Sequence, residues 1–299
     1  MSTLSELVDQ TVSEIGSYVK NQESVTILTN SLTSSDLTMS IDDATALSKG
    51  IVEIDDELIY LKKVIQVNST AQILGASGAP AGRGWKDSTA AAHSLGAIVR
   101  NNPLFPRIQI KRALLDTIKG MNFPCIASET FTFNGSDYSY IMPDSLVDIT
   151  GISWDVPDST GVWQLIKGWR LDTNYYDEDT ASIKQALILK ESPMPGRTVN
   201  VQYTKYPTAI TDNQDLTLSG LPASCEDVVR LGAMYRLIST IDPGKVATTA
   251  VTADIIDTPV APGQSTNAAK YLLALYTTRL TEEINKQQNN FLNTIQYTR

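Results

Sequence analysis

Residues 50–65, Gly-Ile-Val-Glu-Ile-Asp-Asp-Glu-Leu-Ile-Tyr-Leu-Lys-Lys-Val-Ile, decide the fold of the N-terminal third of the chain. Two apolar runs stand on either side of Asp55-Asp56-Glu57, which predicts two antiparallel strands joined by a tight turn. Residues 24–28 and 36–41 show the same period-two alternation of apolar and polar side chains. Threonine and β-branched residues favour a pleated, half-buried surface, so the sequence predicts β structure from residue 24 to residue 100.

A second β-rich stretch covers residues 129–206. Short apolar and aromatic segments alternate there with turn dipeptides such as Asn134-Gly135, Pro157-Asp158 and Pro195-Gly196. Regular short strands separated by such turns are typical of an antiparallel sandwich or barrel.

Apolar spacings of three and four residues predict helices over four ranges: 4–20, about 106–120, about 223–241 and about 265–293. In the second of these helices, Ile110, Leu114 and Ile118 form a stripe that we expect to face the core. A Thr/Ala/Pro-rich stretch at 245–264 is expected to be a loop.

Together these elements predict an α+β fold. In it, a helical bundle of N-terminal, central and long C-terminal helices carries two antiparallel β-rich insertions, one of them sandwich- or barrel-like. The predicted division is an N-terminal helix at 1–22, a β-rich module at 23–103, a core helix at 104–122, a β-sandwich or barrel insertion at 123–208 and a C-terminal helical region at 209–299.

Composition excludes several classes of protein. The chain has 299 residues and a formal net charge of −9, which argues against tight DNA binding, because DNA binders usually carry a basic surplus. Cys125 and Cys225 are too few for a disulfide framework and are expected to be free buried thiols. The N-terminus resembles no signal peptide, and no apolar run approaches the roughly 20 residues of a membrane span, so we expect a soluble cytosolic protein, or one assembled in a cytosol.

The residues available for catalysis are few. His93 is the only histidine and lies in a loop-like stretch, which favours a structural role over a catalytic one. The run Gly75–Gly84 (GASGAPAGRG) lacks the spacing of a phosphate-binding loop and is interpreted as a flexible surface loop with Arg83, Lys86 or both at its tip. Acidic clusters such as Asp55-Asp56-Glu57 lack calcium-loop spacing. The sequence therefore predicts no enzyme activity and no catalytic, cofactor-binding or metal-binding residues, although paired carboxylates for glycoside hydrolysis stay open.

Charge is unevenly distributed along the chain. Residues 1–60 hold two lysines and eleven acidic residues, whereas residues 83–119 hold seven basic residues and two acidic ones. This asymmetry fits head-to-tail contact between copies or an oppositely charged partner, and ordinary balancing of charges within one chain explains it equally well. Within the basic segment we single out a candidate basic patch, formed by Arg107, Lys111 and Arg112.

One part of the chain resembles a known family. Residues 50–61, followed by Gly82-Arg-Gly-Trp-Lys-Asp-Ser-Thr-Ala-Ala-Ala-His-Ser-Leu-Gly-Ala-Ile-Val99 and Asn102-Pro-Leu-Phe-Pro106, are similar to the β-module of head-to-tail adaptor (connector) proteins of tailed bacteriophages. That family shows an ELxxV strand, an RGxxGTTAAAHxxGxxV segment and an NPxFP motif in this order. Here Asp87-Ser88-Thr89 stands where Gly-Thr-Thr is usual. The resemblance covers about residues 30–120 well and the helical third only in general shape.

The resemblance implies a structural virion protein at the neck, assembled in the host cytoplasm. Family members form a homo-oligomeric ring, usually a dodecamer, that contacts the portal protein and a tail or nozzle protein, with genomic double-stranded DNA passing through the lumen. It also implies a C-terminal segment that docks on the portal, for which we single out Phe291, Ile295, Tyr297 and Arg299. No membrane contact and no cofactor are expected.

Two other functions remain open at this point. The same β-modules suit another virion component, such as a tail, baseplate or nozzle subunit. Alternatively, a carbohydrate-binding β-protein would use an aromatic platform made from Trp154, Trp163, Trp169, Tyr175 and Tyr176. Such aromatic residues more often fill the core of a sandwich.

Overall fold

The computed structural model describes residues 2–18, 23–75, 82–157, 161–240 and 264–290. Contacts group the chain into two compact units, both of them discontinuous in sequence. The N-terminal unit contains Ser2–Thr117 and Glu226–Thr277, and the inserted unit contains Ile118–Cys225 and Thr278–Arg299. The unit boundaries therefore fall within two of the long helices.

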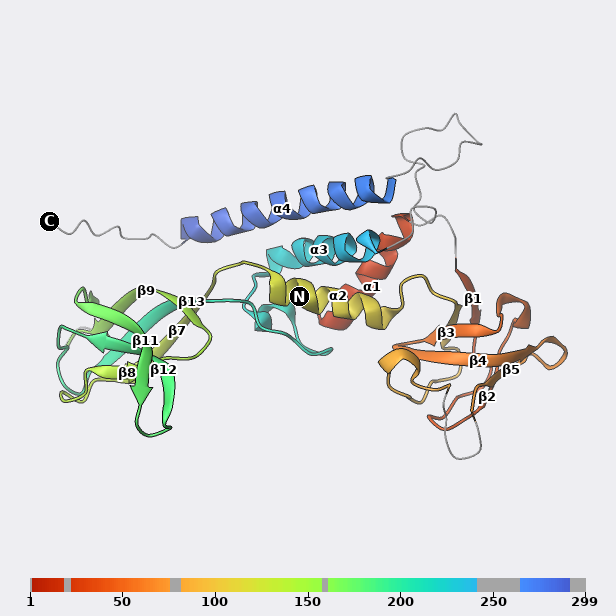
Figure 1. Ribbon diagram of the computed structural model, residues 1–299, viewed down its shortest axis with the longest axis horizontal. Helices are drawn as coiled ribbons and strands as arrows, with labels where there is room; N and C mark the ends of the chain where they lie inside the picture. Colours follow the sequence, from red (N-terminus) through yellow and green to blue (C-terminus); the bar gives the residue numbers. More distant parts are fainter. Residues whose placement is uncertain (1, 19–22, 76–81, 158–160, 241–263, 291–299) are drawn as a thin grey trace. The chain divides into compact units, whose positions relative to one another are not determined.

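A six-stranded antiparallel sheet forms the β part of the N-terminal unit (Figure 1). Its spatial order is β1-β6-β3-β4-β5-β2. The strands are β1 (Ser24–Ile27), β2 (Thr38–Ser40), β3 (Gly50–Ile54), β4 (Glu57–Ile65), β5 (Thr70–Ile73) and β6 (Ile98–Asn101). As predicted, β3 and β4 form a hairpin around a two-residue turn, in which Asp55 adopts a left-handed φ of 52°.

One face of this sheet is buried. Val52 and Ile54 of β3 pack in a hydrophobic cluster with Ile59 and Leu61 of β4 and Val99 of β6. Side chains alternate between the two faces along a strand. Glu53, which lies between Val52 and Ile54, therefore points to the opposite face. A carboxylate is therefore placed beneath the sheet, away from its apolar core.

Four helices accompany the sheets: α1 (Leu4–Ile15), α2 (Arg107–Gly120), α3 (Glu226–Ser239) and α4 (Gln264–Asn290). A capping box of Thr3 and Glu6 starts α1. Ser2 donates hydrogen bonds of 2.9 and 3.0 Å to the carboxylate of Glu226 at the start of α3, across 224 positions of sequence. In α2 the predicted stripe is confirmed, because its three residues are fully buried: Ile110, Leu114 and Ile118.

The inserted unit contains two further antiparallel sheets (Figure 1). One has the order β10-β9-β13-β7 and the other β11-β12-β8. The strands are β7 (Cys125–Thr132), β8 (Ser139–Ile141), β9 (Leu146–Asp155), β10 (Trp163–Leu165), β11 (Trp169–Asp177), β12 (Ser182–Leu189) and β13 (Thr198–Lys205). One hydrophobic cluster joins residues of both sheets, including Ile152, Leu187 and Val201.

The expected fold class, a helical bundle carrying two β-rich insertions, is wrong. Over the described residues the chain is mixed, with thirteen strands in three antiparallel sheets that outweigh the four α-helices. The physical reason is that each β part has a hydrophobic cluster of its own and needs no bundle to cover it. In α4, by contrast, Ala269, Leu272 and Glu283 are the only buried side chains among those described.

Two smaller expectations concern the cysteines and membranes. Cys125 and Cys225 are both buried thiols outside any disulfide, as predicted, and burial raises the pKa of the Cys125 thiol to about 11. Among the described residues, no helix has both the length and the apolar character needed to cross a bilayer.

Candidate functional site

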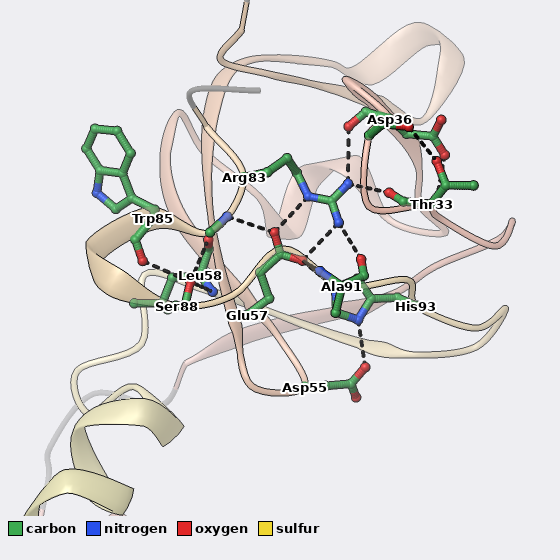
Figure 2. Close-up of polar contacts among 12 residues, drawn as sticks. Thr33, Asp36, Asp55, Glu57, Leu58, Arg83, Trp85, Ser88, Ala91 and His93 are labelled. Carbon is green, nitrogen blue, oxygen red and sulfur yellow. Dashed lines mark hydrogen bonds and ion pairs between the residues drawn. The ribbon is translucent and has the colours of Figure 1, made fainter. Parts of the chain in front are cut away.

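Glu57, the first residue of β4, is the centre of a buried charge network in the N-terminal unit (Figure 2). Arg83 donates two hydrogen bonds to the carboxylate of Glu57, from Nε to Oε1 at 2.7 Å and from Nη2 to Oε2 at 2.9 Å. Both side chains are completely shielded from solvent, with 0% exposure each. A bidentate pair of this kind holds its two partners in one geometry, and neither partner can lose the other without leaving a buried charge.

His93 adds a second cationic group to the network. Its Nε2 lies 2.8 Å from Oε2 of Glu57, and its Nδ1 lies 2.7 Å from Oδ2 of Asp55 in the β3–β4 turn. Both ring nitrogens therefore face carboxylates, and only the imidazolium can donate to both. Burial lowers the pKa of His93, but the hydrogen bonds to the two carboxylates outweigh burial, so that the pKa lies above its usual value.

The carboxylate of Glu57 stays ionised in spite of its burial. Burial alone would raise its pKa, whereas the hydrogen bonds from Arg83 and His93 lower it. Backbone N–H groups contribute as well: Ala91 donates to Oε2 at 3.0 Å and Gly84 to Oε1 at 2.9 Å. The net effect is a pKa of about 2.

Arg83 also binds three backbone carbonyls. Its Nη1 donates to Thr33 at 2.5 Å and to Asp36 at 3.2 Å, and its Nη2 donates to Ala91 at 2.6 Å. The guanidinium thereby fastens residues 33–36 and 91 to the start of β4. The expectation that Arg83 stands at the tip of a flexible surface loop is wrong, because its charge is neutralised inside the unit, whereas Lys86 is exposed.

The glycines on either side of Arg83 fit this arrangement. A Cβ at Gly82 would lie 2.5 Å from the backbone oxygen of Leu74, so no larger residue fits there without movement. Gly84 has a φ of 60°, which favours glycine, and its N–H reaches Glu57. The expected flexible stretch continues through residues 76–81, which lie outside the described residues.

The contacts of the network hold several segments of the unit together. Both ring nitrogens of His93 are engaged by carboxylates, and its side chain is 1% exposed, so it is shielded from solvent. The nearby hydroxyl of Ser88 donates to the carbonyl of Trp85 at 2.9 Å and accepts from the N–H of Leu58 at 3.0 Å. In the part of the chain that the structure describes, no group of three or more His, Cys, Asp or Glu residues is arranged to hold a metal ion.

The three residues of the candidate basic patch differ in their exposure and in their ion pairs. Arg107, at the start of α2, is 14% exposed and makes ion pairs with Asp9 of α1 and with Asp56, the latter at 2.8 Å. Arg112 is 56% exposed and lies 3.9 Å from Asp87. Lys111 is partly buried. At Arg107, therefore, the charge asymmetry seen in the sequence is balanced within the unit.

The remaining candidates are the residues predicted to dock on the portal and the aromatic residues considered for a sugar platform. Phe291, Ile295, Tyr297 and Arg299 lie outside the described residues. Among the aromatic residues considered for a sugar platform, Trp154 and Trp169 pack against the hydrophobic cluster of the inserted unit. The other three differ in exposure: Trp163 and Tyr176 are exposed, and Tyr175 is partly buried and hydrogen-bonded to Ser139.

The chain matches no protein family model, and no curated protein is significantly similar to it. Sequence reasoning missed the pairing of Glu57 with Arg83 and of His93 with Asp55. The available signal was an acidic residue at the start of an apolar strand, together with a lone arginine between two glycines and a lone histidine.

Proposed function

We propose that this protein is a structural virion subunit that forms a head-to-tail adaptor ring beneath the portal of a tailed bacteriophage. In this role it joins the DNA-filled head to the tail and lets DNA pass through its lumen. It acts by assembly and carries out no chemical reaction.

One observation carries the proposal: the residues that bear the resemblance to the adaptor family meet in a single buried network. Glu57 comes from the ELxxV-like strand, Arg83 and Gly84 from the RG motif, and Ala91 and His93 from the AAAH motif. The shared pattern thus has a physical meaning, since it specifies how this β-module closes. A pattern of that kind belongs to a structural module rather than to an active site.

Charge supports the same role. The chain carries a formal net charge of −9, and Arg107 is compensated by Asp9 and Asp56. An acidic subunit offers phosphates few contacts, so a channel built from it allows DNA to slide without holding it. The absence of accessible nucleophile–base pairs in the network is consistent with a function in assembly.

The direct test is assembly with the portal protein of the same genome. The two proteins are co-expressed, purified by a tag on the portal and imaged by negative-stain electron microscopy. We expect a ring of this chain coaxial with the portal ring. A chain that stays monomeric and does not copurify with the portal would refute the proposal, and copurification with tail or baseplate proteins instead would favour the alternative virion role.

A further inference from the structure

A solvent-accessible pocket of about 530 Å³ lies on the N-terminal unit, on the side of the sheet opposite its apolar core. It is bordered by α1, the β3–β4 turn, β6 and the first residue of α2. Four acidic side chains line it (Asp9, Glu53, Asp55 and Asp56), against two basic ones (Arg100 and Arg107). Carboxylates therefore outnumber guanidinium groups around this pocket.

Glu53 is the buried member of this acidic set, with 2% exposure. Its Oε1 accepts a hydrogen bond of 2.5 Å from the backbone N–H of Arg107. Its Oε2 is buried and has no hydrogen-bond partner among the described residues. Burial raises the pKa of this carboxyl. The hydrogen bond from the Arg107 N–H and the charge of Arg100 oppose this effect only in part, so that the pKa lies at about 7. A buried acceptor oxygen without a partner is costly, and a nearby cation would reduce that cost.

The other three carboxylates form the rim of the pocket. The side chains of Asp9, Asp55 and Asp56 are 62%, 64% and 55% exposed. A single guanidinium, that of Arg107, is shared by Asp9 and Asp56, and Asp55 contacts His93. The rim thus keeps acceptor oxygens that point to solvent, which is the arrangement that attracts a basic side chain from outside.

Positive charge lies further along β4, the strand that follows the acidic β3–β4 turn. Lys62 and Lys63 of β4 are exposed, and within the described parts of the chain neither has an ion-pair partner. At about 3.3 Å per residue, they lie roughly 20 Å along the strand from the acidic turn at Asp56. A rigid strand therefore holds an acidic site and a basic site at separate places on one unit.

We propose that Lys62 and Lys63 of one copy bind the acidic pocket around Glu53 in the next copy. The contact joins two different surfaces, so it is heterologous, and a heterologous contact repeats from copy to copy and forms a ring when the rotation between copies closes. Ammonium groups add positive charge to a pocket in which carboxylates outnumber guanidinium groups. This inference rests on the proposed ring function, and it names the residues through which neighbouring subunits recognise each other.

A charge-swap experiment tests this contact. One variant carries K62E and K63E, and the other carries D9K and D56K in the pocket. Self-association of each full-length variant is measured by sedimentation velocity at low ionic strength, alone and in the presence of the portal protein. We expect each variant alone to associate at least about tenfold more weakly than the wild type, because like charges then face each other. Mixed in equal amounts, the two variants should associate again, since each supplies the surface that the other needs.

A control separates this contact from a general effect of charge. The variant K49E/K86E changes the net charge equally at exposed lysines elsewhere in the unit, and it should associate like the wild type. If D9K/D56K does not fold, as judged by its melting temperature, the neutral variant D9N/D56N replaces it and should also weaken association.

Failure of this inference differs from failure of the proposed function. Swapped variants that assemble as well as the wild type, or a mixture no stronger than its parts, would overturn the contact while leaving the adaptor role intact. A wild-type chain that associates neither with itself nor with the portal would overturn both.

Discussion

Replacing Glu57 by glutamine should lower the free energy of unfolding of the N-terminal unit by about 3–5 kcal/mol, the usual cost of removing one partner from a buried ion pair. The substitution keeps the size of the side chain and removes its charge. Five donor groups now point at the carboxylate: two from Arg83 and one each from His93, Gly84 and Ala91. A glutamine amide offers a single oxygen, and its NH₂ group would meet donors rather than acceptors.

Trp85 provides a local signal for this measurement, because it is the only tryptophan of the N-terminal unit and lies 4.9 Å from the ring of Tyr60. Urea unfolding is followed by its fluorescence, with the other three tryptophans replaced by phenylalanine. The matched control is Asp56→Asn, which removes a 55% exposed carboxylate from an ion pair and should cost less than about 1 kcal/mol. If Glu57→Gln costs no more than this control, the network does not stabilise the unit and our reasoning is wrong.

Three further outcomes are expected. Because the pKa of His93 is raised, its contribution to stability is complete below its ordinary value of 6.5 and is lost as pH rises through the higher folded-state pKa. The stability difference between wild type and His93→Gln should therefore shrink with rising pH, and a pH-independent difference would contradict the ionic role. Leu114→Ala should cost about 2–5 kcal/mol in thermal or urea unfolding, since the side chain is fully buried, and a loss below about 0.5 kcal/mol would mean that the site is not packed. Gly82→Ala should lower the melting temperature because its Cβ would meet a backbone oxygen at 2.5 Å, whereas Gly16→Ala, with no atom within 4 Å of its Cβ, should not.

Local patterns predicted the elements of this fold better than their arrangement. The β3–β4 hairpin and the buried face of α2 follow from short-range periodicity, and both are present. The prediction assigned too much of the fold to a helical bundle. Periodicity in α4 indicates a helix, but it does not show how many of the side chains of that helix are buried. Its described side chains are mostly exposed or partly buried, whereas each β part has a hydrophobic cluster of its own.

The charge network was out of reach for a different reason. Arg83 lies 26 residues from Glu57, and His93 lies 36 residues from it. Glycines beside Arg83 favour a flexible loop when only neighbours in sequence are considered. In the structure the same glycines let the backbone approach β4 and β5 closely. Pairing over such separations depends on the sheet that brings the segments together.

The discontinuous N-terminal unit has a consequence for synthesis of the protein. α1 contacts α3, and Ser2, which directly precedes the helix cap, donates hydrogen bonds to Glu226, 224 positions further along the chain. At about 5–20 residues per second, a ribosome takes roughly 10–45 s to make that stretch. The strands of the inserted unit lie in one continuous segment and can fold during this interval. Meanwhile the apolar face of α1, with Leu4, Leu7 and Val8, lacks its contacts with α3 and keeps this part of its surface uncovered until translation passes α3.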